Sequence, residues 1–287
     1  MFRVKSENHW QTVARRWSEL PAPMGPWPSE RKIYQKFTKK CLNGVKSPKI
    51  LILGATPQMR DIAHAFKYAE VTCVDVDVNM LFAMTGLLKN PRNADKEIWV
   101  KSSWVTAPLK ENHYNLILGE AVLGNVPFVL WVKFLKHLQD VLKLDGHFVS
   151  RVVVTDSGNW HGKGLDEVFS YASDKRLNFI ELYFLLFYRI FGSQTRKMSN
   201  LDMYKSIKKY YNRKKRRYVV ENKYVEGLLN KIAKYLPASP FQWSNSPQAF
   251  SERYLKRYFK IIAKDFGNGE SQFSAAYHPL YLLKNIK

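Results

Sequence analysis

One stretch decides the fold: Lys49-Ile50-Leu51-Ile52-Leu53-Gly54-Ala55-Thr56-Pro57-Gln58-Met59-Arg60-Asp61-Ile62-Ala63. Its apolar run over 49–53 predicts a buried β-strand, and apolar residues resume after Pro57 at the spacing of a helix over 58–68. Proline suits the first turn of that helix, because its missing amide hydrogen has no partner there in any case. A second strand over 71–75 ends in Asp75. This order of strand, glycine turn, helix, strand and acid predicts a parallel sheet that binds an adenosine-bearing cofactor at its carboxyl edge.

Strands and helices continue to alternate after this unit, which requires a parallel α/β sheet with right-handed crossovers. Two further strands near the C-terminus flank Gly267-Asn268-Gly269 and predict a closing antiparallel pair. The expected strands after Asp75 are 97–100, 114–120, 148–154, 258–264 and 276–283, with a helix over 127–142 and a turn at 143–147.

The chain divides by these patterns into four segments. Apolar residues at spacings of three and four indicate helices over 7–20 and from Ser29 to about Gly44, with a proline-rich connection between them. After the fifth strand the regular alternation lapses and aromatic-rich helices follow. We expect an N-terminal helical cap over 1–46, a cofactor-binding core over 47–160, a helical substrate-pocket insert over 161–250 and closing strands over 251–287.

The composition is strongly basic, with 46 Lys and Arg against 24 Asp and Glu and a formal net charge of +22. Such a charge favours anionic partners, although a scatter of surface lysines explains it as well. The segment 205–217 mixes basic residues with tyrosines, which suits nucleic acid, but a solvated helix face is the more common reason for such a run. The most apolar stretch, 179–191, is too short to span a membrane and predicts a buried helix. Two cysteines and no signal peptide point to a reducing, cytoplasmic setting.

The candidate cofactor site lies at the ends of the predicted strands. Free amides at the turn after Gly54 can hold an anionic group, but the single glycine disfavours a pyrophosphate-bearing dinucleotide. Asp75 is placed to accept both hydroxyls of a ribose, while Asp77 is expected to cap the next helix. Val76 and Met80 would form an apolar floor for a purine. Two tryptophans, Trp10 and Trp17, would either cover this pocket or pack on the sheet.

These motifs, in this order, resemble class I S-adenosylmethionine-dependent methyltransferases over nearly the whole chain. The resemblance is to a bacterial group whose first motif reads Leu-Gly-Ala/Val-Thr-Pro, here Leu53-Gly54-Ala55-Thr56-Pro57, with a leader like Ala14-Arg15-Arg16-Trp17 and Pro23. It implies a Rossmann-like, seven-stranded, mostly parallel sheet with a terminal antiparallel hairpin, an N-terminal helical lid and a helical insert between the fifth and sixth strands. Carried over, the cofactor-binding positions are Gly54, Ala55, Thr56, Pro57, Asp75, Val76, Met80, Ser103, Trp104, Gly119 and Glu120.

Two of these positions depart from the family pattern. Ser103 stands where an acid often contacts the adenine amino group, and Glu120 stands where the family favours aspartate. Glu120 is the candidate general base, or else an anchor for the amino group of the cofactor. No cluster has metal-ligand spacing, so no metal is expected. Lone histidines such as His161 and His278 are weak catalytic candidates.

The resemblance implies S-adenosyl-L-methionine as cofactor and methyl transfer to O, N or C of a small metabolite, for which an anionic one would suit the charge. The alternatives are methylation of RNA or another polyanion through the basic segment, and a nucleotide-binding module without catalysis. The acceptor and the oligomeric state have no signal in the sequence.

Overall fold

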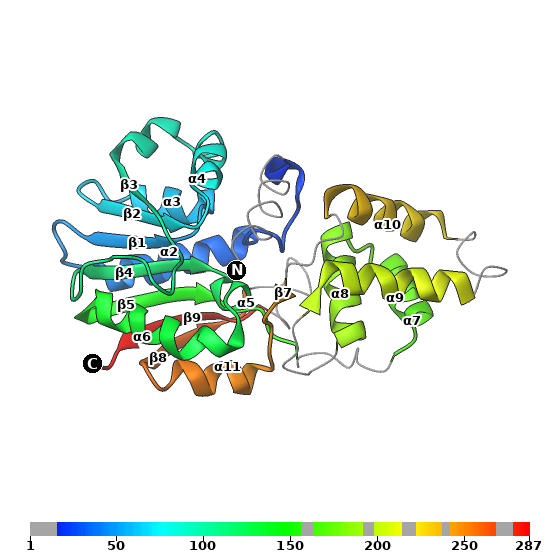
Figure 1. The fold of residues 1–287 in the computed structure, drawn as a ribbon. Helices are drawn as coiled ribbons and strands as arrows, with labels where there is room; N and C mark the ends of the chain where they lie inside the picture. The colour runs from blue at the N-terminus through cyan, green and yellow to red at the C-terminus, as the bar shows by residue number, and fades with distance from the viewer. Residues whose placement is uncertain (1–15, 156–162, 192–197, 214–221, 237–241, 268–277) are drawn as a thin grey trace.

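The computed structural model describes residues 16–155, 163–191, 198–213, 222–236, 242–267 and 278–287 (Figure 1). Its centre is a seven-stranded sheet with the order β3-β2-β1-β4-β5-β9-β8. The first five strands in this order pair in parallel, and β9 is antiparallel to both of its neighbours. The predicted fold class is therefore confirmed. The strands are β1 (Lys49–Leu53), β2 (Glu70–Asp75), β3 (Glu97–Lys101), β4 (Tyr114–Glu120), β5 (Leu142–Arg151), β8 (Phe259–Asp265) and β9 (Leu280–Asn285).

Helices cover both faces of this sheet, as the continuous apolar character of β1 and β4 requires. One face packs against α2 (Pro28–Cys41), α3 (Pro57–His64) and α4 (Val78–Thr85), and the other against α6 (Trp131–Val141) and α11 (Gln248–Leu255). Asp77 caps α4 as predicted, since its Oδ1 accepts a hydrogen bond from the Asn79 amide at 3.0 Å. Shorter elements are α5 (Val122–Asn125) and the 3-10 helices η1 (Trp17–Glu19), η2 (Pro91–Lys96) and η3 (Phe128–Leu130).

Four more helices gather beyond the carboxyl ends of the parallel strands (Figure 1). They are α7 (Leu165–Asp174), α8 (Phe179–Phe191), α9 (Asn200–Arg213) and α10 (Lys223–Tyr235). These helices share a hydrophobic core of their own, in which Ile180, Leu185 and Val168 are fully buried. A short antiparallel pair, β6 (Met198–Ser199) with β7 (Gln242–Trp243), returns the chain toward the sheet. No helix in the described ranges is long and apolar enough to cross a bilayer.

The expected turn at 143–147 and the strand over 148–154 are wrong in their boundaries. β5 begins at Leu142 and ends at Arg151. Tyr114 pairs with Leu142 but Leu116 pairs with His147, so residues 143–146 bulge inside the strand. Gly146 permits this bulge, because a Cβ there would lie 2.8 Å from the Lys143 carbonyl oxygen.

Other expectations differ from the structure at segment ends or lie outside the described residues. The helix after Gly54 ends at His64, and the helix expected over 127–142 begins at Trp131. Most of the expected 7–20 helix falls outside the described residues, as do the basic run 214–217, His161 and the turn 268–269.

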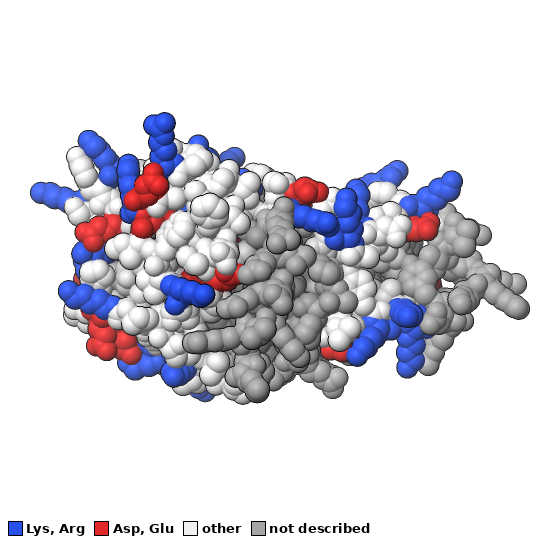
Figure 2. All heavy atoms as spheres, turned by 45° about the horizontal axis from the view of Figure 1, so that its top comes forward, with Lys and Arg blue, Asp and Glu red and all other residues white. Residues whose placement is uncertain are grey.

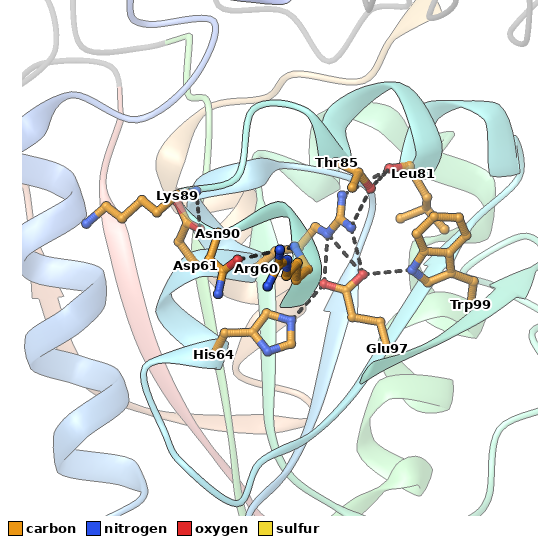
Figure 3. Close-up of polar contacts among 10 residues, drawn as sticks. Arg60, Asp61, His64, Leu81, Thr85, Lys89, Asn90, Glu97 and Trp99 are labelled. Carbon is orange, nitrogen blue, oxygen red and sulfur yellow. Dashed lines mark hydrogen bonds and ion pairs between the residues drawn. The ribbon is translucent and has the colours of Figure 1, made fainter. Parts of the chain in front are cut away.

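A buried ion-pair network fastens α3 and α4 to the start of β3 (Figure 3). Arg60 Nη2 lies 2.7 Å from Glu97 Oε2, and both side chains are fully buried. Glu97 also accepts hydrogen bonds from Trp99 Nε1 at 2.7 Å and pairs with His64 Nε2 at 2.9 Å. Arg60 Nη1 reaches the Leu81 carbonyl of α4 at 3.0 Å. This network lies at the edge of the sheet away from the carboxyl ends of the strands, so we assign it to stability.

Candidate functional site

A cavity of about 230 Å³ opens at the carboxyl ends of the parallel strands. One part is formed by the turn after β1, the end of β2 and the segment after β3. The other part is formed by residues after β4 and β5, by the N-terminal segment and by the helical insert. The first part includes Gly54, Ala55, Thr56, Asp75, Val76, Met80, Ser103 and Trp104, and the second includes Trp17, Glu120, Ala121, Gly124, Asn125, Arg151, Phe184, Trp243 and Asn245.

The turn at Gly54 is held in a conformation that favours glycine. Its φ is +96°, and its amide donates a hydrogen bond to the Val74 carbonyl at 2.9 Å. Trp104 Nε1 donates to the same carbonyl at 2.7 Å, which fixes the indole ring beside the turn. A Cβ on Gly54 would meet Trp104 Cζ2 at 3.4 Å and Asp75 Oδ2 at 3.9 Å. The turn, the indole and the carboxylate thus enclose one concave surface.

The variant Gly54→Ala is expected to weaken cofactor binding about tenfold or more. An alanine at this φ is strained and its methyl group points toward Asp75. Isothermal titration with S-adenosylhomocysteine measures the effect. Gly227→Ala is the matched control, because a Cβ at Gly227 on α10 meets nothing within 4 Å. Equal affinity in both variants would show that Gly54 does not belong to the cofactor site.

Asp75 ends β2 with one carboxylate oxygen engaged and the other turned toward the cavity. Its Oδ1 accepts a hydrogen bond from the Asp77 amide at 2.9 Å, while Oδ2 faces the Gly54 turn. Burial raises the pKa of Asp75 to about 7, even though the backbone hydrogen bonds from Asp77 and Val76 lower it. A half-buried carboxylate of this kind has acceptor capacity for the hydroxyl groups of a ligand.

The neighbouring wall is largely apolar. Val76 and Met80 line the cavity beside Ser103 and Trp104. The Ser103 Oγ accepts a weak hydrogen bond from the Val105 amide at 3.3 Å, which orients the hydroxyl. The wall therefore combines apolar side chains with the hydroxyl of Ser103.

Glu120 ends β4 inside a buried polar cluster. Its Oε2 lies 2.7 Å from the Tyr34 hydroxyl of α2, and its Oε1 forms an ion pair with Arg151 Nη2 of β5. Arg151 also donates to Glu30 Oε2 at 3.1 Å and to the Pro23 carbonyl at 2.7 Å. Burial raises the pKa of Glu120, and the Arg151 guanidinium lowers it by less. Both oxygens of the candidate base are therefore engaged by the protein itself.

Two of the eleven expected cofactor-binding positions do not line the cavity. Pro57 is buried in the first turn of α3. Gly119 is packed under the chain that follows it, and a Cβ there would lie 2.9 Å from Val122 Cγ1. Their place in the site stays a prediction, and their observed role is to shape the backbone on either side of it.

The sequence predicts that the insert over 161–250 forms a substrate pocket and offers Trp17 as a candidate cover, but of the other residues in the second part of the cavity it indicated only Glu120. Arg151 had a signal, since a lone arginine inside an apolar strand indicates a buried ion pair. Ala121 turns the chain out of β4 with a left-handed φ of +53°, an uncommon conformation for alanine. Phe184 and Trp243 come from the helical insert, and nothing in their local sequence marks them as cavity residues.

His278 is a fully buried histidine next to this cluster. Its ring lies edge-on to Phe184, with centroids 5.7 Å apart. Burial, and to a lesser extent Arg151, lowers its pKa well below the ordinary value, so the imidazole is neutral. Among the residues that the structure describes, no group of three or more His, Cys, Asp or Glu is arranged to hold a metal ion.

No protein-family model and no curated protein matches the sequence, whereas solved structures match its fold. The N-methyltransferase NodS from Bradyrhizobium japonicum WM9, in complex with S-adenosylhomocysteine, is similar with a TM-score of 0.51 and 11% identity over 98% of this chain and 100% of that one. A SAM-dependent methyltransferase from Methanosarcina mazei has a TM-score of 0.50 and 10% identity over 91% and 98%.

A third structure is from Rhodobacter sphaeroides and carries a suggested assignment as a Zn-dependent alcohol dehydrogenase. Its TM-score is 0.57, with 11% identity over 98% of each chain. Two of the three descriptions name methyltransferases and the third names an alcohol dehydrogenase, and identities this low establish the fold and not the reaction. The sheet order, with one antiparallel strand next to the last position, is that of the Rossmann-like methyltransferase fold.

Proposed function

We propose that the protein is an S-adenosylmethionine-dependent methyltransferase that acts on a small molecule. The observation that carries the proposal is the meeting of the Gly54 turn and Asp75 Oδ2 at one cavity on the carboxyl edge of the sheet. The match of Leu53-Gly54-Ala55-Thr56-Pro57 to one bacterial methyltransferase group supports it and is part of the proposal.

The residues present fit this cofactor. The glycine cradle at Gly54 leaves space that a Cβ would fill, and Ala55 and Thr56 continue the same wall. Asp75 would accept hydrogen bonds from the ribose hydroxyls, with Val76 and Met80 against the adenine. A single glycine in the turn suits a ligand without a pyrophosphate.

When bound, S-adenosylmethionine supplies an electrophilic methyl group: a bond forms between the acceptor atom and the methyl carbon, the carbon–sulfur bond breaks with its electron pair on sulfur, and an acceptor that carried a proton releases it. The chain would contribute alignment of the two reactants and exclusion of water. The apolar and aromatic walls around Phe184, Trp243 and Trp17 suit this task.

The acceptor would enter the part of the cavity that the insert helps to form. Phe184 belongs to α8, Trp243 ends β7, and Asn245 follows β7. An acceptor with an apolar body would pack against the two aromatic rings.

Calorimetric titration distinguishes this cofactor from a dinucleotide. We expect S-adenosylmethionine and S-adenosylhomocysteine to bind with one site per chain, and NAD⁺ to show no heat of binding at the same concentrations. Binding of NAD⁺ without binding of S-adenosylhomocysteine would overturn the proposal in favour of an oxidoreductase. Loss of the methyl group from S-adenosylmethionine in a cell extract would then exclude a module that only binds.

A polyanionic substrate is the second candidate, and one observation favours it. Lys205, Lys208 and Lys209 are all exposed and lie three and four residues apart on α9. On the face shown in Figure 2, however, Lys and Arg side chains lie at both ends of the molecule and alternate with Asp and Glu. Among the described residues on that face, the charged side chains form no single patch.

Replacing the three lysines of α9 by alanine is expected to leave RNA binding unchanged if the acceptor is a small molecule. If RNA is the substrate, the same variant should lose affinity and the slope of log affinity against log salt should fall by about 2–3. Filter binding at several salt concentrations measures both quantities. If the slope of log affinity against log salt is steep and the triple variant reduces it, a polyanion becomes the favoured substrate.

A further inference from the structure

The Tyr34 hydroxyl has more acceptors around it than it has hydrogens. It accepts from the Arg151 backbone amide at 2.7 Å and lies 2.8 Å from the Gly119 carbonyl and 2.7 Å from Glu120 Oε2. A tyrosine has a single hydrogen to donate. If both neighbours were bare acceptors, one pair of oxygens would face each other at hydrogen-bond distance with no hydrogen between them. A carbonyl cannot supply the missing hydrogen, but a carboxyl group can.

The charge balance of the same cluster also favours a protonated carboxyl group. The Arg151 guanidinium is shared by the carboxyl groups of Glu120 and Glu30, and all three side chains are almost completely buried. One guanidinium balances one carboxylate. A second carboxyl group buried beside the same guanidinium loses its hydration, which favours its neutral, protonated form. Glu30 is the better acceptor of the two, because its Oε2 also accepts from the Trp27 amide at 2.8 Å.

We infer that Glu120 is a protonated carboxylic acid in the ligand-free protein, with its hydrogen on Oε2 donated to the Tyr34 hydroxyl. Tyr34 then donates to the Gly119 carbonyl and accepts from Glu120 and from the Arg151 amide, so all three close contacts of the Tyr34 hydroxyl have a hydrogen between their atoms. The unprotonated Oε1 still faces Arg151 Nη2.

The groups that face Glu120 agree with this assignment. α2 contributes Glu30 and Tyr34, β5 contributes Arg151, and His278 before β9 is neutral. Burial and the Glu30 charge raise the pKa of Glu120, in the direction that the hydrogen count requires. Asp75 lines the same cavity, and because it is an acid it cannot favour the ionisation of Glu120.

The inference goes beyond the proposed function and changes the role open to Glu120. A carboxyl group that already carries a proton and contacts Tyr34 and Arg151 cannot take a proton from a methyl acceptor. Glu120 and Tyr34 are therefore positioning residues, which join the N-terminal helix α2 to the end of the sheet below the cavity. If methyl transfer is the reaction, this favours an acceptor such as a neutral amine, whose nitrogen attacks with its own lone pair.

Infrared difference spectroscopy of the protein without cofactor tests the protonation state. We expect the wild type minus Glu120→Gln spectrum at about pH 8 to show the C=O band of a carboxylic acid and no carboxylate bands. The same difference taken in an Asp75→Asn background removes Asp75, whose pKa of about 7 lies close to this range. Tyr34→Phe should keep the acid band but shift it to higher frequency, because the hydrogen bond to the hydroxyl is lost. Carboxylate bands in place of the acid band would overturn the inference.

Thermal unfolding gives a second readout with a matched control. Glutamine reproduces the donor and the acceptor of a protonated Glu120, so Glu120→Gln is expected to unfold within about 2 °C of wild type. Glu97→Gln replaces a carboxylate that accepts from Arg60, His64 and Trp99, and should lower the midpoint by about 5–10 °C. A loss for Glu120→Gln as large as for the control, or failure to fold, would show an ionised Glu120. Neither measurement involves the cofactor. A result that contradicts the protonation of Glu120 is therefore distinguishable from a failure of the proposed function.

Discussion

An Asp75→Ala variant is expected to bind S-adenosylhomocysteine about 100-fold more weakly than wild type. A hydrogen bond to a charged group contributes about 1.5–3 kcal/mol, and each 1.4 kcal/mol is a factor of ten in affinity. The estimate corresponds to loss of two ribose contacts at Oδ2, the carboxylate oxygen that faces the Gly54 turn. Asp61→Ala is the control, because Asp61 lies on α3, does not line the cavity and accepts a hydrogen bond from the Lys89 amide.

The affinity should also depend on pH near neutrality. Burial raises the pKa of Asp75 to about 7 in the ligand-free protein, and the ionised form is the better acceptor. We therefore expect binding to strengthen from pH 6 to pH 8 and to release protons near pH 7, an effect that Asp75→Asn abolishes. Calorimetry in two buffers of different ionisation enthalpy measures the proton count. An affinity that is independent of pH, with no proton release, would show that Asp75 does not contact the ligand.

The same pKa has a consequence for stability that can be checked without a ligand. The folded-state pKa of about 7 exceeds the ordinary value of 3.8, so the folded chain binds more protons than the unfolded chain between these values. The contribution of Asp75 to stability is present below about pH 4 and is lost as the pH rises through 7. Asp75→Asn should accordingly be more stable than wild type above pH 7.

Glu97→Gln is expected to lose about 3–5 kcal/mol of unfolding free energy at neutral pH, the loss typical of breaking a buried ion pair. Arg60 keeps its charge in this variant while its bidentate partner becomes an amide (Figure 3). The cost is large because the guanidinium, fully buried between α3, α4 and β3, has no access to water. Urea denaturation measures the loss. Glu70→Gln breaks the exposed pair with Lys49 and should cost at most about 1 kcal/mol.

The contribution of Glu97 has a defined pH range. Burial raises its pKa, but hydrogen bonds from His64, Arg60 and Trp99 together hold it at about 2. The folded-state pKa lies below the ordinary value of 4.5, so the stabilisation is present above about pH 4.5 and is lost as the pH falls through 2. The difference in stability between wild type and Glu97→Gln should shrink over that range. A constant difference down to pH 2 would contradict the ionised pair.

The sequence predicts those parts of this fold that depend on local pattern. Strand and helix periodicity identified the sheet, and the Asp77 cap followed from an acid placed before an apolar helix. The β5 bulge was missed because Lys143-Leu144-Asp145-Gly146 has the composition of a turn, while tertiary pairing keeps it within the strand. Composition alone does not distinguish the two outcomes.

The polar cluster under the cavity was missed for a different reason. Tyr34, Glu120 and Arg151 are more than thirty residues apart from one another, and each looks ordinary in its own segment. Tyr34 reads as one more apolar residue on an amphipathic helix, and its hydroxyl acquires a role only when α2 crosses the ends of β4 and β5. The same holds for Phe184 and Trp243, which reach the cavity because the insert folds back over the strand ends.

The most direct test of the account is a structure of the protein with S-adenosylhomocysteine. We expect the ribose hydroxyls within hydrogen-bond distance of the Asp75 carboxylate, the adenine between Val76 and Met80, and the amino-acid part over Gly54, Ala55 and Thr56. A ligand bound elsewhere, or one whose ribose makes no contact with Asp75, would contradict it.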